Sequence, residues 1–240
     1  PDIRAQVDAC AAMHPPALRG SPIASVGLTN GDIDHIAGLL TLREKTGFDV
    51  YATSAGLDIL RSNSVFGVLD PELVAQHQIT LDMPFEPVPG LTVTPFAVPG
   101  KVALFLEGDT LNLEEVGEQT VGLLLEDGTS RAAYVPGCAA IPDWLLDRLG
   151  GDDLLLYDGT VWNNDDIQRT GTGEKTGARM GQVPLNGELG SLDRMADVDG
   201  RKEFIHINNT NPILQPDSAE RAEVLAKGWD IAFDGMEISL

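Results

Sequence analysis

Two of the four histidines follow runs that are typical of buried strands. His35 lies in DIDHIAGLL, shortly after the apolar run at 26–28, and His206 interrupts FIHINNTNP. Imidazole is the commonest metal ligand and also exchanges protons near neutral pH. Asn208 and Asn209 follow His206, and such a polar cluster after a buried strand needs solvent or partners. The two segments therefore predict a functional site.

Carboxylates occur in the same kind of place. Asp32 and Asp34 precede His35 at the start of a predicted helix, and Asp158 ends the apolar run in LLLYDGTVW. A helix N-terminus favours a carboxylate, and side chains on its first turn can converge on one cation. Alternatively, Asp32 or Asp34 only caps the helix. Because ligands bind outside strand ends in layered α/β folds, three such ends favour a site.

The other candidate features predict no chemistry. His14 and His77 have polar or proline-rich surroundings, and we interpret both as surface residues. The glycine-rich segment 171–181 is predicted to be a mobile loop. It is not a phosphate-binding P-loop, because that motif needs glycine directly before its lysine and here Glu174 precedes Lys175.

Strand-like and helix-like segments alternate along the chain. Predicted strands are 25–30, 49–53, 91–98, 120–126, 131–135, 153–160, 203–208 and the tail 229–240, with hairpin turns at Asp127-Gly128 and Asp234-Gly235. Predicted helices are 34–46, 141–151 and 217–228, the last with Asp217 and Glu220 in capping-box spacing and Gly228 as its stop. This order predicts a layered α/β fold.

Size and charge narrow the function classes. The 240 residues suit one domain, 1–240, and the formal charge of −21 makes nucleic acid an unsuitable partner. The chain has no apolar run long enough for a membrane helix, so we expect no membrane insertion. Cys10 and Cys138 make neither a disulfide framework nor a CxxC site, which predicts a reducing cytoplasm.

Several blocks resemble a known family. TNGDIDHIAGLLTLRE, AYVPGCA, LLLYDGTVW, TGTGEKTGARMG and HINNTNPIL are similar to the pyrroloquinoline quinone (PQQ) biosynthesis protein B family of the metallo-β-lactamase superfamily. The resemblance implies an αββα sandwich. That family also has an N-terminal part with a CxCxxC zinc segment, which this chain lacks. We therefore expect the first strands of the sandwich to be missing here.

The superfamily motif HxHxDH is altered in this chain. Its first two histidines correspond to Asn30 and Asp32. Lys101 in VPGK occupies the position of a further ligand histidine. Gly137 in YVPGC occupies the position of the aspartate that usually bridges two metals. Gln182 stands where the family usually has histidine. A lysine ammonium would repel a cation, so the two-metal hydrolytic site is expected to be lost.

The resemblance leaves one metal site, with Asp34, His35 and His206 as its implied ligands. Two histidines and one carboxylate form the facial triad of mononuclear Fe(II) oxygenases, which leaves positions open for O₂ and substrate. Zn(II) could fill the same ligands, with water as the fourth. Asp158 is expected either to orient a histidine or to be a fourth ligand.

The implied function is the O₂-dependent, iron-dependent hydroxylation of the tyrosine ring in a small Glu-Tyr-derived PQQ precursor. Asp32 and Asp158 are the expected catalytic carboxylates, and Lys101, Arg179, Asn208 and Asn209 the expected substrate-binding residues. Two alternatives stay open: a zinc hydrolase, and a non-catalytic carrier that helps transport PQQ or its precursor to the periplasm. Other PQQ-biosynthesis proteins and a second copy of the chain are the expected protein partners.

Overall fold

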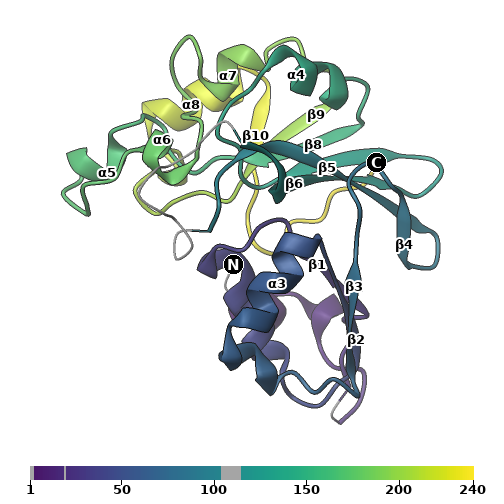
Figure 1. The fold of residues 1–240 in the computed structure, drawn as a ribbon. Coiled ribbons are helices and arrows are strands. Elements are labelled where there is room, and N and C mark those ends of the chain that lie inside the picture. Colours follow the sequence, from purple (N-terminus) through teal and green to yellow (C-terminus); the bar gives the residue numbers. More distant parts are fainter. Residues whose placement is uncertain (1–2, 19, 104–114) are drawn as a thin grey trace.

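The computed structural model describes residues 3–18, 20–103 and 115–240 (Figure 1). In these ranges the strands form a three-stranded sheet, ordered β1-β2-β3, and a seven-stranded sheet, ordered β10-β9-β8-β7-β6-β5-β4. The small sheet contains β1 (Ser25–Gly27), β2 (Phe48–Ala52) and β3 (Val74–Gln78). The large sheet contains β4 (Phe85–Val88), β5 (Leu91–Gly100), β6 (Glu115–Glu126), β7 (Arg131–Val135), β8 (Leu154–Asp158), β9 (Arg201–Ile205) and β10 (Trp229–Ile231).

The large sheet is antiparallel in one half and parallel in the other. Strands β4 to β7 form an antiparallel meander, and Asp127-Gly128 makes the predicted hairpin turn between β6 and β7. Strands β7, β8, β9 and β10 are parallel. The carboxyl ends of β8 and β9 are therefore side by side, with Asp158 pairing with Ile205 just before His206. This register brings two distant sequence segments to one edge.

Helices cover the outer face of the large sheet. The α-helices of the described ranges are α1 (Ile3–Ala9), α2 (Ile33–Ile36), α3 (Ser54–Ser62), α4 (Asp143–Leu149), α5 (Asp166–Arg169), α6 (Gly177–Met180), α7 (Ser191–Arg194) and α8 (Ala219–Ala226). Figure 1 shows α4, α7 and α8 on one side of the large sheet and α3 beside the small one. The main core joins Leu145, Leu192 and Val224 of these helices to Leu155 and Phe204 of the sheet. The predicted α/β layering is confirmed.

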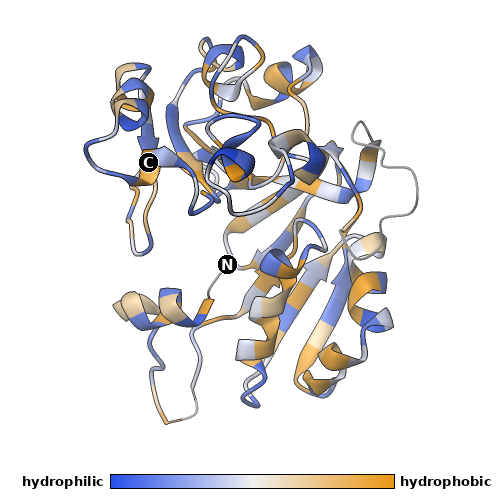
Figure 2. Ribbon diagram, turned by 90° about the vertical axis from the view of Figure 1, so that its left-hand side faces the viewer, coloured by the Kyte–Doolittle hydropathy of each residue, from blue (hydrophilic) through white to orange (hydrophobic). Residues whose placement is uncertain are grey.

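A second core belongs to the small sheet. Val50 and Ala52 of β2 pack with Ile36, Leu57 and Leu60 of the neighbouring helices. Figure 2 shows hydrophobic residues in the strands and helices of both parts and hydrophilic residues in many loops. The small sheet joins the large one after β1, because the Val121 N–H donates to the Thr29 carbonyl (2.8 Å) and Asn30 bridges to Thr120. This junction holds the segment that carries His35.

The predicted helix at 34–46 is wrong in type. The chain forms the short α2 and then a 3₁₀ helix, Ala37–Leu42. Ile36, Leu39, Leu40 and Leu42 all pack in or against the small core. In a 3₁₀ helix, residues three apart, such as Leu39 and Leu42, eclipse one another on one face.

Two predictions near the C-terminus also need correction. Helix α8 is capped by the Ser218 hydroxyl, which accepts from the Arg221 N–H (3.0 Å), and not by Asp217. Gly228 has a φ of +78° and does stop the helix region. The turn at Asp234-Gly235 forms, but residues 236–240 have no strand, so the tail is not a hairpin. No neighbouring strand pairs with that tail in the described structure.

The predicted loop at 171–181 ends in the short helix α6, so its last part is ordered. In the described ranges, no helix is both long and apolar enough to cross a membrane.

Candidate metal centre

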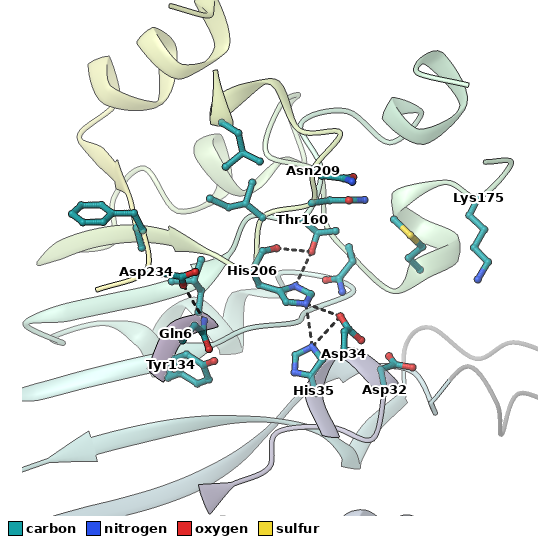
Figure 3. Close-up of a pocket in the computed structure, with 18 of the residues that line it drawn as sticks. Gln6, Asp32, Asp34, His35, Tyr134, Thr160, Lys175, His206, Asn209 and Asp234 are labelled. Carbon is teal, nitrogen blue, oxygen red and sulfur yellow. Dashed lines mark hydrogen bonds and ion pairs between the residues drawn. The ribbon is translucent and has the colours of Figure 1, made fainter. Parts of the chain in front are cut away.

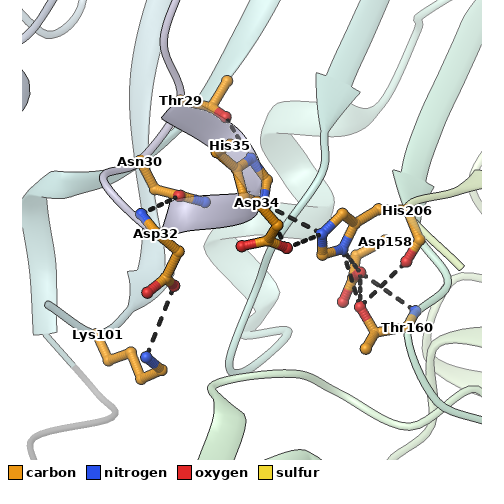
Figure 4. Close-up of polar contacts among 9 residues, drawn as sticks. All are labelled: Thr29, Asn30, Asp32, Asp34, His35, Lys101, Asp158, Thr160 and His206. Carbon is orange, nitrogen blue, oxygen red and sulfur yellow. Dashed lines mark hydrogen bonds and ion pairs between the residues drawn. The ribbon is translucent and has the colours of Figure 1, made fainter. Parts of the chain in front are cut away.

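Asp34, His35 and His206 meet at the junction of the two sheets (Figure 4). Their ligand atoms all lie within 4.8 Å of one another, the one such His/Cys/Asp/Glu group within the described ranges. His206 Nε2 lies 3.1 Å from Asp34 Oδ2 and 3.1 Å from His35 Nε2. The three side chains come from α2 and from the end of β9, 171 residues apart between the histidines. The predicted ligand set is therefore brought together.

The turn after β1 aims α2 at this centre. The Asn30 side-chain oxygen accepts from the Asp32 N–H (3.0 Å), which is a local Asx turn. A Cβ at Gly31 would lie 2.2 Å from Ile59 Cδ1, so a larger residue there would force the buried Ile59 side chain to shift. Asp32 stands at the N-cap position of α2, but its side chain makes no capping bond. The capping interpretation of Asp32 is thus wrong, and its carboxylate is directed elsewhere.

His206 is held by the last residue of β8 and by a residue just after it. Its Nδ1 lies 3.1 Å from Asp158 Oδ1 and 2.9 Å from the Thr160 hydroxyl, which itself donates to Asp158 Oδ1 (2.6 Å). Asp158 is fully buried. Because a carboxylate accepts, the Nδ1–H of His206 points to Asp158 and Nε2 is left for the centre. Asp158 is thus placed to orient His206, which is one of its two predicted roles.

The backbone of His206 supports this placement. Its φ is +54°, in the left-handed region that few residues other than glycine adopt. The Thr160 hydroxyl also lies 3.2 Å from the His206 carbonyl oxygen, and the Asn208 N–H donates to the Thr160 carbonyl (3.2 Å). These contacts hold a strained turn that points the ring inward.

The protonation states of Asp34, His35 and His206 depend strongly on one another. The hydrogen bond from His206, opposed by burial, keeps the pKa of Asp34 far below its usual value. Burial opposes protonation of His206, but hydrogen bonds to Asp158 and Asp34 raise its pKa to about 9. Burial and the neighbouring His206 lower the pKa of His35 to about 4. Burial raises the pKa of Asp158. The two carboxylates thus favour positive charge at this centre, which His206 carries as an imidazolium when no metal is bound.

The donor set fits one transition metal ion. Two Nε2 atoms and one carboxylate oxygen converge from one side, as in sites that bind Zn(II) or Fe(II) and leave positions open. The Asp34 side chain is 62% exposed, whereas that of His35 is 9% exposed, so the centre opens to solvent on the aspartate side. A substrate could reach it from there.

The residues that the resemblance aligns with ligands of a second metal also lie near the centre. A Cβ built on Gly137 would lie 3.7 Å from Asn30 Nδ2 and 3.8 Å from Gln182 Nε2. Lys101 is 8% exposed, and its ammonium lies 3.6 Å from Asp32 Oδ2 (Figure 4). The Lys101 ammonium, paired with Asp32, would repel a second cation bound beside it.

A cavity of about 890 Å³ surrounds the centre (Figure 3). It is lined by the predicted substrate-binding residues Lys101, Arg179, Asn208 and Asn209, as well as by Asp32 and Gln182. Sequence reasoning missed Gln6, Tyr134, Lys175 and Phe233, which also line it. In the sequence, Lys175 stands out only because it lies in the glycine-rich segment that is not a P-loop. No motif indicates the other three residues.

The remaining histidines and the cysteines lie apart from the triad. His14 is exposed and contacts the Asp8 carbonyl (3.2 Å). His77, on β3, pairs with Asp49 (3.1 Å). Cys10 and Cys138 are free thiols, and burial raises the pKa of Cys138 to about 12. His14 and His77 agree with their predicted surface character.

Comparison with known proteins identifies the family. The model of the beta-lactamase superfamily domain matches residues 1–207. Coenzyme PQQ synthesis protein B of Ruegeria pomeroyi is 52% identical over 240 residues, which are 100% of this chain and 81% of that protein. Its counterpart from Methylobacterium sp. is 54% identical over 242 residues, with the same shares covered. The chain belongs to the coenzyme PQQ synthesis protein B family.

A solved structure agrees with this assignment. The Zn(2+)-bound PqqB from Methylobacterium extorquens has a TM-score of 0.97 and 52% identity, and the match covers 100% of this chain and 81% of that one. The metallo-beta-lactamase fold protein YhfI from Bacillus subtilis matches with a TM-score of 0.60 at 14% identity over 88% of this chain and 75% of that one. That second likeness shows the fold alone. The predicted family and fold class are both confirmed.

Proposed function

We propose that the chain acts in PQQ biosynthesis as a mononuclear, iron-dependent hydroxylase of the tyrosine ring in a small Glu-Tyr-derived precursor. The observation that carries this proposal is the convergence of Asp34, His35 and His206 beside a position filled by Lys101. A two-metal hydrolase holds its reacting oxygens between two ions. Lys101, which the resemblance aligns with a ligand of the second ion, supports a single-metal centre. Two histidines and one carboxylate with open positions are the ligand set of mononuclear Fe(II) oxygenases, which supports the redox assignment.

The three ligands would hold Fe(II), which when bound supplies the reaction with O₂. The chain's own residues do the remaining work. Asp158 and Thr160 keep the His206 ring turned so that Nε2 faces the centre. A fixed ring orientation lowers the cost of ordering the ligands when the ion binds.

Asp32 is placed to exchange a proton with a bound ring. Its carboxylate lines the cavity and its side chain is 29% exposed, so substrate can reach it. Ring hydroxylation replaces a ring hydrogen, which must leave as a proton. A carboxylate can accept that proton, and the Asp32 carboxylate is held 3.6 Å from the Lys101 ammonium. Both assignments are part of the proposal.

Substrate binding is assigned to the residues around this cavity. Lys101 and Arg179 supply positive charge for carboxylates, and Asn208 and Asn209 supply amide donors and acceptors at the end of β9. A cavity of about 890 Å³ lies in the range of small-molecule sites. A dipeptide-sized precursor therefore suits it.

Anaerobic reconstitution tests the proposal. Metal-free chain loaded with Fe(II) should bind one iron per chain. With added ascorbate, which supplies the two electrons that reduce the second oxygen atom of O₂ to water, it should consume O₂ and add one oxygen atom to the tyrosine ring of a Glu-Tyr dipeptide. Iron binding without O₂ consumption or product on this dipeptide would contradict the hydroxylase assignment.

Zinc defines the main alternative. The relative from Methylobacterium extorquens was solved with Zn(2+), and the same three ligands suit zinc with a water as the fourth. Zinc-dependent cleavage of an ester or phosphodiester that is lost on chelation would favour a hydrolase. Tight PQQ binding with no turnover in either metal form would favour a non-catalytic carrier.

A further inference from the structure

Each sheet of the described ranges has two edge strands, and one of these edges is unprotected. An edge strand presents unpaired N–H and C=O groups, which proteins usually protect by short length, charge, proline or a bulge. Strands β1 and β10, at one edge of each sheet, have three residues each. Strand β4 contains Pro87 and a register irregularity. Strand β3, with five residues in continuous register, has none of these features.

Strand β3 is exposed to solvent and free of formal charge. Its sequence VAQHQ has four exposed residues after the buried Val74. The uncharged run is longer than the strand, since residues 73–81 contain no Lys, Arg, Asp or Glu. The chain as a whole carries a formal charge of −21. At this edge a second copy can therefore approach without directly opposed like charges.

The register with β2 shows which backbone groups of β3 point outward. The Phe48 N–H donates to the Leu73 carbonyl (3.2 Å), and the Ile79 N–H donates to the Ala52 carbonyl (2.9 Å). In a parallel pair, alternate residues of a strand bond to its neighbour. The odd-numbered residues of β3 therefore face β2, and the even-numbered ones direct their backbone groups away from it.

Gln76 lies at the centre of this outward row. The Val74 N–H donates to the Asp70 carbonyl (2.8 Å), whereas the backbone groups of Gln76 and Gln78 have no such partner among the described residues. Figure 1 shows β3 beside β2 at the outer edge of the small sheet. An incoming strand would thus find the N–H and C=O of Gln76 ready to pair.

We propose that two copies of this chain pair through β3, edge to edge and antiparallel, with the two-fold axis at Gln76. In this register Gln76 lies opposite itself, and the two residues exchange both backbone hydrogen bonds. Each Gln78 N–H donates to the Val74 carbonyl of the other copy. The two small sheets become one continuous sheet, and the interface uses the same surface of both copies, as two-fold symmetry requires.

The side chains of β3 fit this register on both faces. Arg61 Nε donates to Gln76 Oε1 (3.3 Å), which leaves the Gln76 NH₂ group to donate to its counterpart across the axis. On the other face, Ala75 lies opposite His77 of the other copy. The small alanine leaves room for that imidazole, which stacks on Tyr51 with ring centroids 4.8 Å apart. The strand is thus its own complement, which favours a second copy as the occupant of this edge.

Sedimentation velocity of the purified chain over a concentration series tests the pairing. The unmodified chain should form a dimer that dissociates on dilution. Gln76→Pro removes the central N–H, and an edge strand tolerates proline where that N–H faces away from its neighbour. It should weaken dimerisation about tenfold or more, because two hydrogen bonds between the copies are lost. Circular dichroism checks that the variant still folds.

A charged variant has a matched control. Gln76→Lys places two ammonium groups opposite one another on the axis, so it should weaken the dimer at least as much as proline does. Gln215→Lys adds the same charge at an exposed position between the 3₁₀ helix Pro212–Leu214 and α8, beside the large sheet. Its dimerisation should stay within about twofold of the unmodified chain, since distant exposed charges are screened.

A cross-link at the axis tests the register. The background is Cys10→Ser, which leaves the buried Cys138. In a hydrogen-bonded pair the two Cα atoms lie about 5.5 Å apart, within the range that a disulfide spans, so oxidation of Gln76→Cys with diamide should give a covalent dimer. Gln78→Cys is the control. Gln78 lies opposite Val74 of the other copy, so its own counterpart is about 13 Å away and should not cross-link.

The proposal is overturned if the unmodified chain is a monomer at every concentration, since β3 would then have another occupant or none. It is also overturned if the dimer survives both Gln76 variants, or if Gln215→Lys weakens it equally. Equal cross-linking through Gln76→Cys and Gln78→Cys would refute the axis at Gln76. These outcomes are independent of the hydroxylase assignment, because no residue of β3 lines the cavity around the triad.

Discussion

Asp158 accepts from the Nδ1 side of His206 at 3.1 Å while the Nε2 of the same ring faces Asp34 at 3.1 Å. One buried carboxylate therefore fixes which nitrogen is free to bind metal. Asp158→Asn keeps the shape and removes the charge. We expect metal affinity to fall by about 10- to 100-fold, because ligand basicity and orientation are both lost. Competition with a chelator measures it, and an unchanged affinity would refute the orienting role.

Removing a ligand should have a larger effect. His206→Ala leaves only His35 and Asp34, fewer than the three protein ligands of such a site, so the purified chain should retain no metal after desalting. His77→Ala is the control, since His77 lies on β3 and pairs with Asp49. Metal content of both variants is measured by elemental analysis. Full metal content in His206→Ala would show that the ligand assignment is wrong.

Metal uptake should release one proton near pH 7. The pKa of His206 is raised to about 9 in the metal-free chain, so this ring is protonated below that pH and must lose its proton to bind metal. The pKa of His35 is lowered to about 4, so that ring is already neutral. Apparent affinity should therefore rise about tenfold per pH unit from 7 to 9 and then level off.

Calorimetry in buffers with different ionisation enthalpies counts the released protons. Release of two protons at pH 7 would contradict the neutral state of His35. Asp158→Asn removes a partner that raises the pKa of His206, so this variant should release less than one proton at pH 8.

The Lys101–Asp32 pair should contribute to stability as a unit. Lys101 is buried, and Lys101→Met leaves the Asp32 carboxylate without that ammonium. We expect a loss of about 1–3 kcal/mol in the free energy of unfolding. The double variant Lys101→Met/Asp32→Asn should lose less than the sum of the single variants, because the charges interact. Denaturant unfolding measures the cycle, and strict additivity would argue against the pair.

The local residue pattern identified the centre, and the resemblance supplied its ligand set. Polar residues at strand ends marked His35, His206 and Asp158. Parallel pairing brings the ends of β8 and β9 to one edge of the large sheet, whereas His35 follows β1 of the small sheet. The 3₁₀ helix after α2 was missed because propensity favoured a continuous α-helix while core packing decided the spacing. The positive φ of His206 has no sequence signal, because it depends on contacts with Thr160 across 46 residues.

The residues that line the cavity show the same limit of sequence-based prediction. Lys175 lies in a segment whose composition predicts a loop. The hydrogen-bonded backbone of Gly177 and Ala178 places this segment at the cavity. Tyr134 alternates with buried neighbours on β7 as any strand residue would. Such residues become functional candidates through tertiary placement, which a single sequence does not reveal.

Thr160 offers the sharpest test of how the centre is positioned. Its hydroxyl donates to Asp158 Oδ1 (2.6 Å), and the residue is 6% exposed. Thr160→Val conserves the shape but removes this donor, so Asp158 becomes a buried carboxylate with one hydrogen bond fewer. The free energy of unfolding should fall by about 1–3 kcal/mol and metal affinity should fall with it, because His206 loses its fixed orientation.

Thr160→Ser keeps the hydroxyl and loses a methyl group, so it should retain metal affinity while losing about 1 kcal/mol or less of stability. Thr170→Val is the control, since that hydroxyl bonds to the Asp166 carbonyl on α5, away from the triad. Thermal unfolding and titration with Co(II), followed by its absorption spectrum, separate the two effects. Equal loss of metal affinity in Thr160→Val and Thr160→Ser would assign the effect to packing of the methyl group. The hydroxyl would then have no part in holding His206.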